Sequence, residues 1–135
     1  MGNKSYEGKR GPNGLLMYVV KDRETEGAQV SRLSPRTDLM KHTPNGAFEC
    51  GFKGSGPSQL ALAILADHLN DVGEAVDLHL NFRDRVIVGL PRDRDWCLSK
   101  ANIDTQLEGL RSSGAKSPAP ALMKVTSANP GGLTV

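Results

Sequence analysis

A chain of 135 residues is long enough for one domain with its own hydrophobic core, and a formal net charge of +2 does not indicate a nucleic-acid-binding surface. The two cysteines, Cys50 and Cys97, lack the spacing of a zinc ribbon or of a secreted disulfide scaffold, so we expect two buried free thiols. The first residues contain no apolar signal segment and no stretch is long enough to cross a membrane, so we expect a cytoplasmic protein.

The chain begins with a stretch of low apolar content, residues 1–13, in which Lys4, Lys9 and Arg10 lie among glycines. Such a segment buries too little surface to offset the entropy of ordering, and it is predicted to be a disordered basic arm. Residues 15–20 are apolar with β-branched and aromatic members, which predicts a buried strand. Residues 28–33 partly alternate and are expected to pair with that strand as a hairpin.

The next segment combines turn signals with a third strand signal. Ser34 and Pro35 favour one helical turn that runs to Met40, and residues 43–46 form a turn. Residues 47–51 are predicted to form a third short strand.

The strongest helix signal follows residues 51–56, which are rich in glycine. Residues 60–66 are all apolar, so this helix is predicted to be buried around most of its circumference. Ser55 or Gly56 is the expected cap, and the helix should begin within a residue of Pro57, because proline suits the first helical position. Asn70 is expected to end it.

Two further helices are predicted. Asp71 with Glu74 three residues later is typical of a reciprocal cap, and the second helix should end before Pro91. Its apolar stripe comprises Ala75, Leu78, His79, Phe82 and Val86. Residues 96–98 are a strand candidate, and Ser99 then caps a third helix whose apolar face comprises Ile103, Leu107 and Leu110.

These elements predict an α+β fold in which a small antiparallel sheet packs on a helical hairpin, with a short C-terminal helix, because the strand signals precede the helix signals instead of alternating with them. The predicted organisation is a disordered arm over residues 1–13, one domain over residues 14–111, and a disordered tail rich in Ser, Pro and Gly over residues 112–135.

The run GSGPSQLALAILADHL resembles a family of small, uncharacterised proteins of bacteria, archaea and mobile elements that is known as a domain of unknown function. Upstream residues that fall in the same order include Asp38, His42, Phe48 and Gly51. Where relatives resemble "EWGYGGSGP", this chain has Cys50 in place of the aromatic residue. The resemblance covers roughly residues 19–103, and it implies a shared fold unit but no activity.

The glycine-rich turn is the best candidate site, because a helix N-terminus offers free N–H groups to an anion such as phosphate or carboxylate. The candidate ligand-binding residues are Lys53, Gly54, Ser55, Gly56, Gln59, His42 and Glu49. The turn is not a P-loop, because GxxxxGK[ST] is absent. The structural alternative, which we favour, is that the glycines only let strand and helix pack closely.

Histidines supply the second group of candidates. Asp38, His42 and Glu49 could form an acid/base group, although roles in fixing the loop are favoured for Asp38 and His42. His68 and His79 are expected to be hydrogen-bonded histidines of the core or its rim, and we expect no metal site and no cofactor.

Three function classes remain, in this order of preference. The first is a small non-enzymatic accessory protein, associated with a mobile genetic element, that binds a macromolecular partner, most simply a protein. The second is a module that binds a small anionic ligand at the GSGP helix start. The third is a small enzyme that uses Asp38, His42 and Glu49. A shared pocket at the turn would favour the second or third class, whereas an exposed apolar patch would favour the first.

Overall fold

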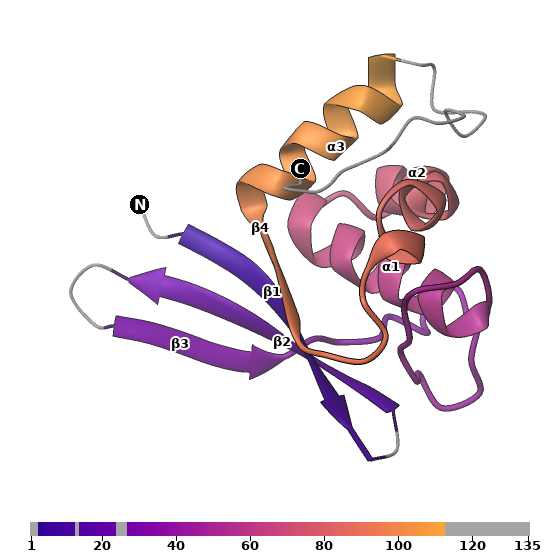
Figure 1. Cartoon of the computed structure of the whole chain (residues 1–135). Coiled ribbons are helices and arrows are strands. Elements are labelled where there is room, and N and C mark those ends of the chain that lie inside the picture. The colour runs from indigo at the N-terminus through magenta and orange to yellow at the C-terminus, as the bar shows by residue number, and fades with distance from the viewer. Residues whose placement is uncertain (1–2, 13, 24–26, 113–135) are drawn as a thin grey trace.

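The chain forms a four-stranded antiparallel sheet with three helices on one side of it, as the computed structural model shows for residues 3–12, 14–23 and 27–112 (Figure 1). This is the predicted α+β class. The strands, in the spatial order β3-β2-β1-β4, are β1 (Asn3–Gly11), β2 (Gly14–Arg23), β3 (Gly27–Arg32) and β4 (Trp96–Ser99). The helices are α1 (Ser55–Leu69), α2 (Val72–Arg85), the short 3-10 helix η1 (Ile87–Gly89), and α3 (Lys100–Ser112).

The sequence of β2 decides which face of the sheet is covered. Leu15, Met17 and Val19 are buried beneath the helices, whereas the alternate side chains point to the opposite face, because side chains in a strand alternate between the two sides. The predicted hairpin is confirmed, since β2 and β3 pair with Val20 opposite Val30.

The expectation of a disordered arm is wrong for residues 3–11, which form the inner strand β1 between β2 and β4. The strand is held by two residues that face the helices. Tyr6 is fully buried and donates its hydroxyl to Asp67 Oδ2 of α1 at 2.6 Å. Gly8 lies beneath the indole of Trp96, where a Cβ atom would be only 2.5 Å from the ring. The domain therefore starts in β1, and residues 1, 2 and 13 lie outside the described part.

The predicted third strand over residues 47–51 is also wrong, because this segment makes only an isolated bridge from Phe48 to Leu15. Leu15 pairs with Arg10 of β1 on one edge of β2, so Phe48 lies on the other edge, where β3 already pairs with residues 18–23. Phe48 and Cys50 nevertheless bury their side chains, Cys50 completely. The strand candidate at Trp96 is confirmed as β4, which pairs with β1.

Cys97 is exposed, so the prediction of two buried thiols holds for Cys50 alone. Cys97 lies between two residues of β4 that face the helices, Trp96 and Leu98, and so its own side chain points to the uncovered side of the sheet.

Most predicted helix signals are confirmed, with an earlier start for α1. Its N-cap is Gly54, without a side-chain hydrogen bond, so the helix begins at Ser55, two residues before Pro57. Asn70 ends it in the left-handed conformation, with φ 56°. Asp71 caps α2 by accepting from Glu74 N at 3.1 Å.

Two local expectations need correction. The Glu74 carboxylate binds Arg111 of α3 instead of returning to the cap of α2. Residues 37–39 form a single turn in which Leu39 N and Met40 N both donate to Arg36 O, so the predicted turn reaches Met40 but begins at Arg36 instead of at Ser34 and Pro35.

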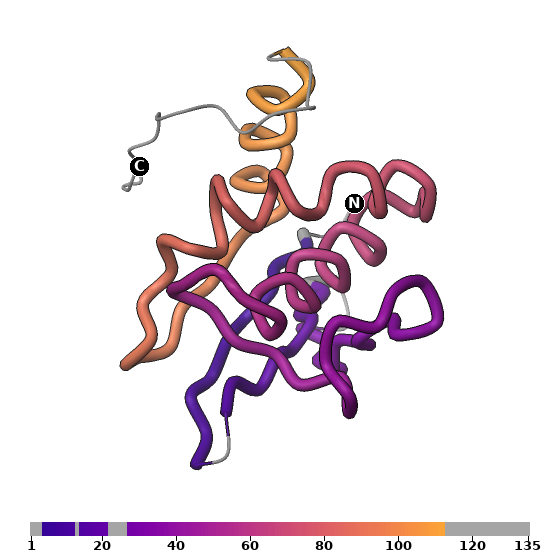
Figure 2. Tube along the Cα trace, turned by 90° about the vertical axis from the view of Figure 1, so that its right-hand side faces the viewer, coloured from indigo at the N-terminus to yellow at the C-terminus, as the bar shows by residue number. Residues whose placement is uncertain are grey.

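Helix α1 lies between the sheet and α2, which explains why every residue from Leu60 to Ala66 is buried (Figure 2). Helix α3 continues directly from β4 and packs its predicted apolar face, Ile103, Leu107 and Leu110, into the core. The predicted disordered tail is wrong for Ser112, the last residue of α3, and otherwise lies outside the described residues.

Candidate functional site

The glycines of the GSGP turn lie against neighbouring side chains. A Cβ atom at Gly54 would be 2.8 Å from the ring of Phe52, and one at Gly56 would be 2.7 Å from Glu49 Cβ. Gly54 O already accepts two hydrogen bonds from Ser58, one from the backbone N and one from the hydroxyl at 2.7 Å. These contacts support the packing interpretation of the turn.

Gln59 is fully buried and holds the loop that precedes the turn. Its Oε1 accepts from the backbone N atoms of His42, at 2.7 Å, and Thr43, at 3.3 Å. Its Nε2 donates to the backbone O atoms of Pro35, at 2.6 Å, and Met40, at 3.1 Å. Four hydrogen bonds saturate the amide, so this candidate ligand residue stabilises the loop over residues 35–43 instead.

His42 and His79 form a pair in which the two Nε2 atoms lie 3.0 Å apart. His79 Nδ1 lies 2.6 Å from Val76 O, which can only accept, so the proton of the neutral His79 ring is on Nδ1. His79 Nε2 is then the acceptor, and His42 donates through its Nε2–H. The predictions that His79 is a hydrogen-bonded core residue and that His42 fixes a loop are consistent with this pair.

The environment of the pair disfavours its charged forms. Burial lowers the pKa of His42, and the positive charge of Arg83 lowers it further. Burial also lowers the pKa of His79, with smaller effects of the same sign from His42 and Arg83 and an opposing one from the hydrogen bond to Val76. Both rings are therefore neutral at neutral pH.

Lys53 and Ser58 belong to a network of polar side-chain contacts that links the turn to the end of α2. Lys53 Nζ lies 3.8 Å from Asp84 Oδ2, and Arg83 Nε donates to Asp84 Oδ1 at 2.8 Å. Arg83 Nη1 also donates to Ser58 Oγ at 2.9 Å. The candidate cation of the turn is thus already next to a carboxylate, while Ser55 is exposed at the helix start.

The structure does not bring Asp38, His42 and Glu49 together. Glu49 accepts both of its hydrogen bonds from Arg10 Nη1 of β1, at 2.8 and 2.9 Å. Asp38 is an exposed partner of Arg36, whose guanidinium lowers the pKa of this carboxyl. Because each of the three has a different partner, the geometry gives the acid/base interpretation no support.

His68 lies at the rim of the core, as predicted, with its Nε2 2.7 Å from Asp104 Oδ1 of α3. Among the residues that the structure describes, no group of three or more His, Cys, Asp or Glu side chains is arranged to hold a metal ion.

Exposed apolar side chains lie on a different surface, the face of the sheet that no described helix covers. We call this surface the open face. Its apolar residues are Leu16, Tyr18 and Val20 of β2 with Ala28 and Val30 of β3. Leu16 is 37% exposed and Val30 60% exposed. Val20 and Val30 are direct cross-strand neighbours, and Arg32 lies over the Tyr18 ring at 5.5 Å, so these side chains form one continuous patch.

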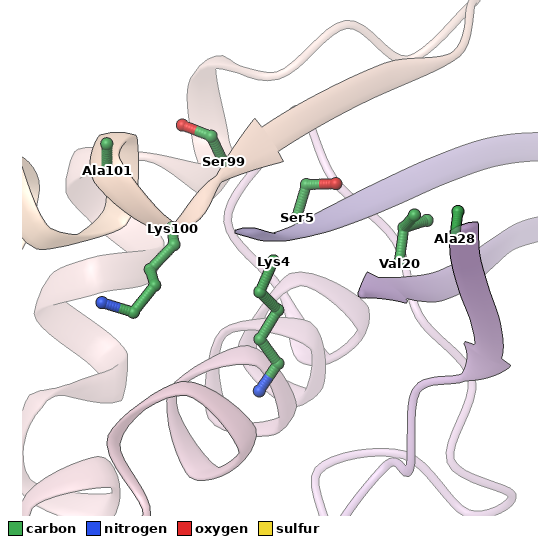
Figure 3. Close-up of a pocket in the computed structure, with 7 residues that line it drawn as sticks. All are labelled: Lys4, Ser5, Val20, Ala28, Ser99, Lys100 and Ala101. Carbon is green, nitrogen blue, oxygen red and sulfur yellow. The ribbon is translucent and has the colours of Figure 1, made fainter. Parts of the chain in front are cut away.

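The open face is hollowed at the end of the sheet where β1 begins and β4 runs into α3. A shallow depression of about 420 Å³ includes Val20 and Ala28 of the patch (Figure 3). The other residues that line it are Lys4, Ser5, Ser99, Lys100 and Ala101. The depression contains none of the predicted site residues, because the GSGP turn belongs to the helical side of the sheet.

Sequence reasoning placed Leu16, Tyr18 and Val20 in the interior as part of one apolar run. The signal that could have identified the open face is strand periodicity, since only alternate residues of a sheet with one covered face are buried. In the uninterrupted apolar run from residue 15 to residue 20, three residues belong to each face of the strand, so apolar side chains also lie on the face that no described helix covers. No described helix is both long and apolar enough to span a membrane.

Comparison with known proteins gives one match. The model of a family of unknown function (DUF6166) matches residues 6–109. This range omits only the first three residues of β1 and the last three of α3 among the helices and strands described above. No curated protein and no solved structure matches the chain.

Proposed function

Since this chain belongs to the DUF6166 family, a family of unknown function, we propose from its own surface that it is a small non-enzymatic accessory protein that binds a macromolecular partner through the open face. The observation that carries the proposal is the continuous apolar patch of Leu16, Tyr18, Val20, Ala28 and Val30. Single exposed apolar residues are ordinary on a protein surface, but a contiguous patch with a polar rim is typical of an interaction site.

The chemistry of the face favours a protein over a nucleic acid. Arg32 is engaged with the Tyr18 ring, and Lys9 lies 3.9 Å from Glu7, so positive charge is not concentrated there. Nucleic-acid surfaces need clustered Lys and Arg to neutralise phosphates. Tyr and Arg beside apolar side chains are instead characteristic of protein interfaces. The expected partner is a protein with a complementary apolar surface.

The polar residues of the GSGP turn support a non-enzymatic role. The Gln59 amide makes four hydrogen bonds, both Glu49 oxygens accept from Arg10, and His42 Nε2 is bonded to His79 within the domain. A catalytic or anion-binding group has to present free donors or lone pairs to its substrate. The resemblance of the GSGP run to proteins of mobile elements supports an accessory role within such an element.

The proposal is tested by a matched pair of leucine variants. Leu16 is 37% exposed on the open face, and Leu80 is 42% exposed on α2, away from the sheet. Tagged wild type, Leu16→Glu and Leu80→Glu are used to capture partners from native-host lysate, and mass spectrometry compares the three captures. We expect a protein that binds wild type and Leu80→Glu but not Leu16→Glu.

The interaction is then measured with purified components by calorimetry. Burying an unpaired carboxylate at the interface should weaken the affinity at least tenfold for Leu16→Glu, and about 1.4 kcal/mol corresponds to each factor of ten. Equal melting temperatures of the two variants exclude unfolding as the cause. Equal affinity of Leu16→Glu and wild type would show that the partner binds elsewhere.

A further inference from the structure

The two edges of the sheet differ in how they are protected. Strand β4 has only four residues and runs directly into α3. Strand β3 has six residues, all of them exposed, and lies at the opposite edge (Figure 1). An edge strand presents a row of unpaired backbone N–H and C=O groups, so β3 is the edge available for pairing.

Strand β3 also lacks the features that prevent edge pairing. Residues 27–31 (GAQVS) include neither a charged residue nor a proline. The register with β2 runs without interruption from Gly27 opposite Arg23 to Arg32 opposite Tyr18, so there is no bulge. Monomeric proteins commonly place lysine, proline or a bulge at such an edge, and their absence from β3 indicates that the edge is used.

We propose that β3 pairs antiparallel with β3 of a second copy of this chain, which joins the two sheets into one. Directly opposite residues in an antiparallel pair point to the same face of the sheet. Successive residues of a strand point to opposite faces. In a symmetric pair one residue of β3 must therefore lie directly opposite the same residue of the second copy, with the two-fold axis midway between the two. An axis at Val30 keeps the uncharged part of β3 in the pair.

This register is self-complementary. Val30 faces Val30 of the second copy, and Gln29 faces Ser31 of the second copy. Arg32 faces Ala28, a small side chain, so no like charges oppose one another, which would destabilise a cross-strand pair. Arg32 keeps its position over Tyr18, which lies on the same face.

Pairing at Val30 also enlarges the open face. Val20 and Val30 are direct neighbours within one copy, so the valines of both copies form one row across the two-fold axis. Because that axis is perpendicular to the sheet, both open faces lie on the same side. The dimer does not depend on the proposed partner, and Leu16→Glu is expected to remain dimeric.

A single strand pair buries less area than a standard protein interface, so we expect a dissociation constant in the micromolar range. Sedimentation equilibrium of the full chain, from low to high micromolar concentration, should show a monomer–dimer equilibrium. A wild-type chain that remains monomeric over this range would overturn the proposal.

The register is tested by charge reversal at the two-fold axis. Val30→Lys and Val30→Glu each place like charges directly opposite one another, so each variant alone should dissociate at least ten times more readily than wild type. An equimolar mixture of the two should form heterodimers, because the opposing charges are then of opposite sign. Val72, which is 47% exposed at the start of α2, supplies the matched controls Val72→Lys and Val72→Glu, which should dimerise like wild type.

Circular dichroism and melting temperatures show whether each variant is folded. The mixture experiment distinguishes charge repulsion from a folding defect, because a misfolded variant would not recover dimerisation with its opposite-charge counterpart. Dimers that persist in Val30→Lys and Val30→Glu alone, or a mixture that stays monomeric, would overturn pairing through β3.

Discussion

The GSGP turn and the open face of the sheet use their residues in opposite ways. At the turn, nearly every polar side chain that resembles a binding group has a partner inside the domain, as Gln59 does with four hydrogen bonds and Glu49 with Arg10. On the open face, Leu16 and Val30 expose apolar surface to solvent. The polar residues that attract attention in the sequence stabilise the fold, and unremarkable valines and leucines form the surface available for binding.

The difference has a physical cause. The loop over residues 35–43 forms no helix or strand, so its backbone N–H and C=O groups need other partners, and the buried amide of Gln59 satisfies four of them at once. A sheet covered on one side needs no such device on the other side. Apolar residues there bury less surface on folding than those beneath the helices, so they stabilise the fold less and leave apolar surface accessible.

The largest effect in this comparison is expected from Gln59→Leu. Leucine fits an apolar core but leaves two backbone N–H groups and two backbone C=O groups of the loop without their partner. We expect the free energy of unfolding to fall by about 3–5 kcal/mol. Urea denaturation measures it, with Ser55→Ala, an exposed neighbour in the same turn, as the control that should change by less than about 0.5 kcal/mol.

If the two variants were equally stable, Gln59 would not hold the loop. Its side chain would then be free for a ligand, and the contrast between the turn and the open face would fail.

A smaller effect is expected from Gly56→Ala. The added Cβ atom would lie 2.7 Å from Glu49 Cβ and 3.1 Å from Glu49 N, so the loop must shift, at a cost of about 1–3 kcal/mol. Gly89 is the matched control, because a Cβ atom there meets nothing within 4 Å and its φ is not positive. Gly89→Ala should be neutral or slightly stabilising in the same thermal melts.

Phosphate sharpens this test. If the glycines serve packing alone, phosphate should not raise the melting temperature beyond an ionic-strength control. A saturable rise in wild type that is lost in Gly56→Ala would falsify the packing interpretation, since a ligand of the folded state stabilises it by mass action.

The smallest effect is expected from pH, through the pair of His42 and His79. Burial lowers the pKa of both rings in the folded state, whereas unfolded histidines titrate near about 6.5. Below that pH the unfolded chain binds protons that the folded chain resists. Stability should therefore be complete above about pH 6.5 and decrease as the pH falls toward the lowered pKa values.

Urea denaturation at a series of pH values measures this dependence in wild type and His79→Gln. The variant should lose part of the slope between neutral pH and the range where carboxyl groups titrate. An unchanged slope would mean that His79 is not the buried neutral ring that its contacts indicate.

The sequence by itself determined the elements whose signals are local. The apolar run of α1, its end at Asn70, the Asp71 cap and the hairpin of β2 with β3 all follow from residues within a few positions of one another. The α+β class follows from their order along the chain.

Only the tertiary structure decided the role of β1. Its residues include charges and glycines that resemble a disordered arm, and its stability comes from partners distant in sequence: Asp67 for Tyr6, Trp96 for Gly8 and Glu49 for Arg10. The segment at Phe48 likewise meets β2 only at Leu15, beyond the end of β3, which pairs with residues 18–23 along that same edge, so it remains a single bridge instead of a strand.

The same limit applies to the candidate site. Gln59, Glu49 and His42 could bind a ligand or bind other groups of the domain. The outcome depends on contacts with residues 17 to 39 positions away in the sequence. Which half of the apolar run in β2 is covered depends on the side of the sheet that the helices occupy. Local pattern carries the propensity of a segment, whereas the partner of a side chain is decided by packing between segments that only the folded chain brings together.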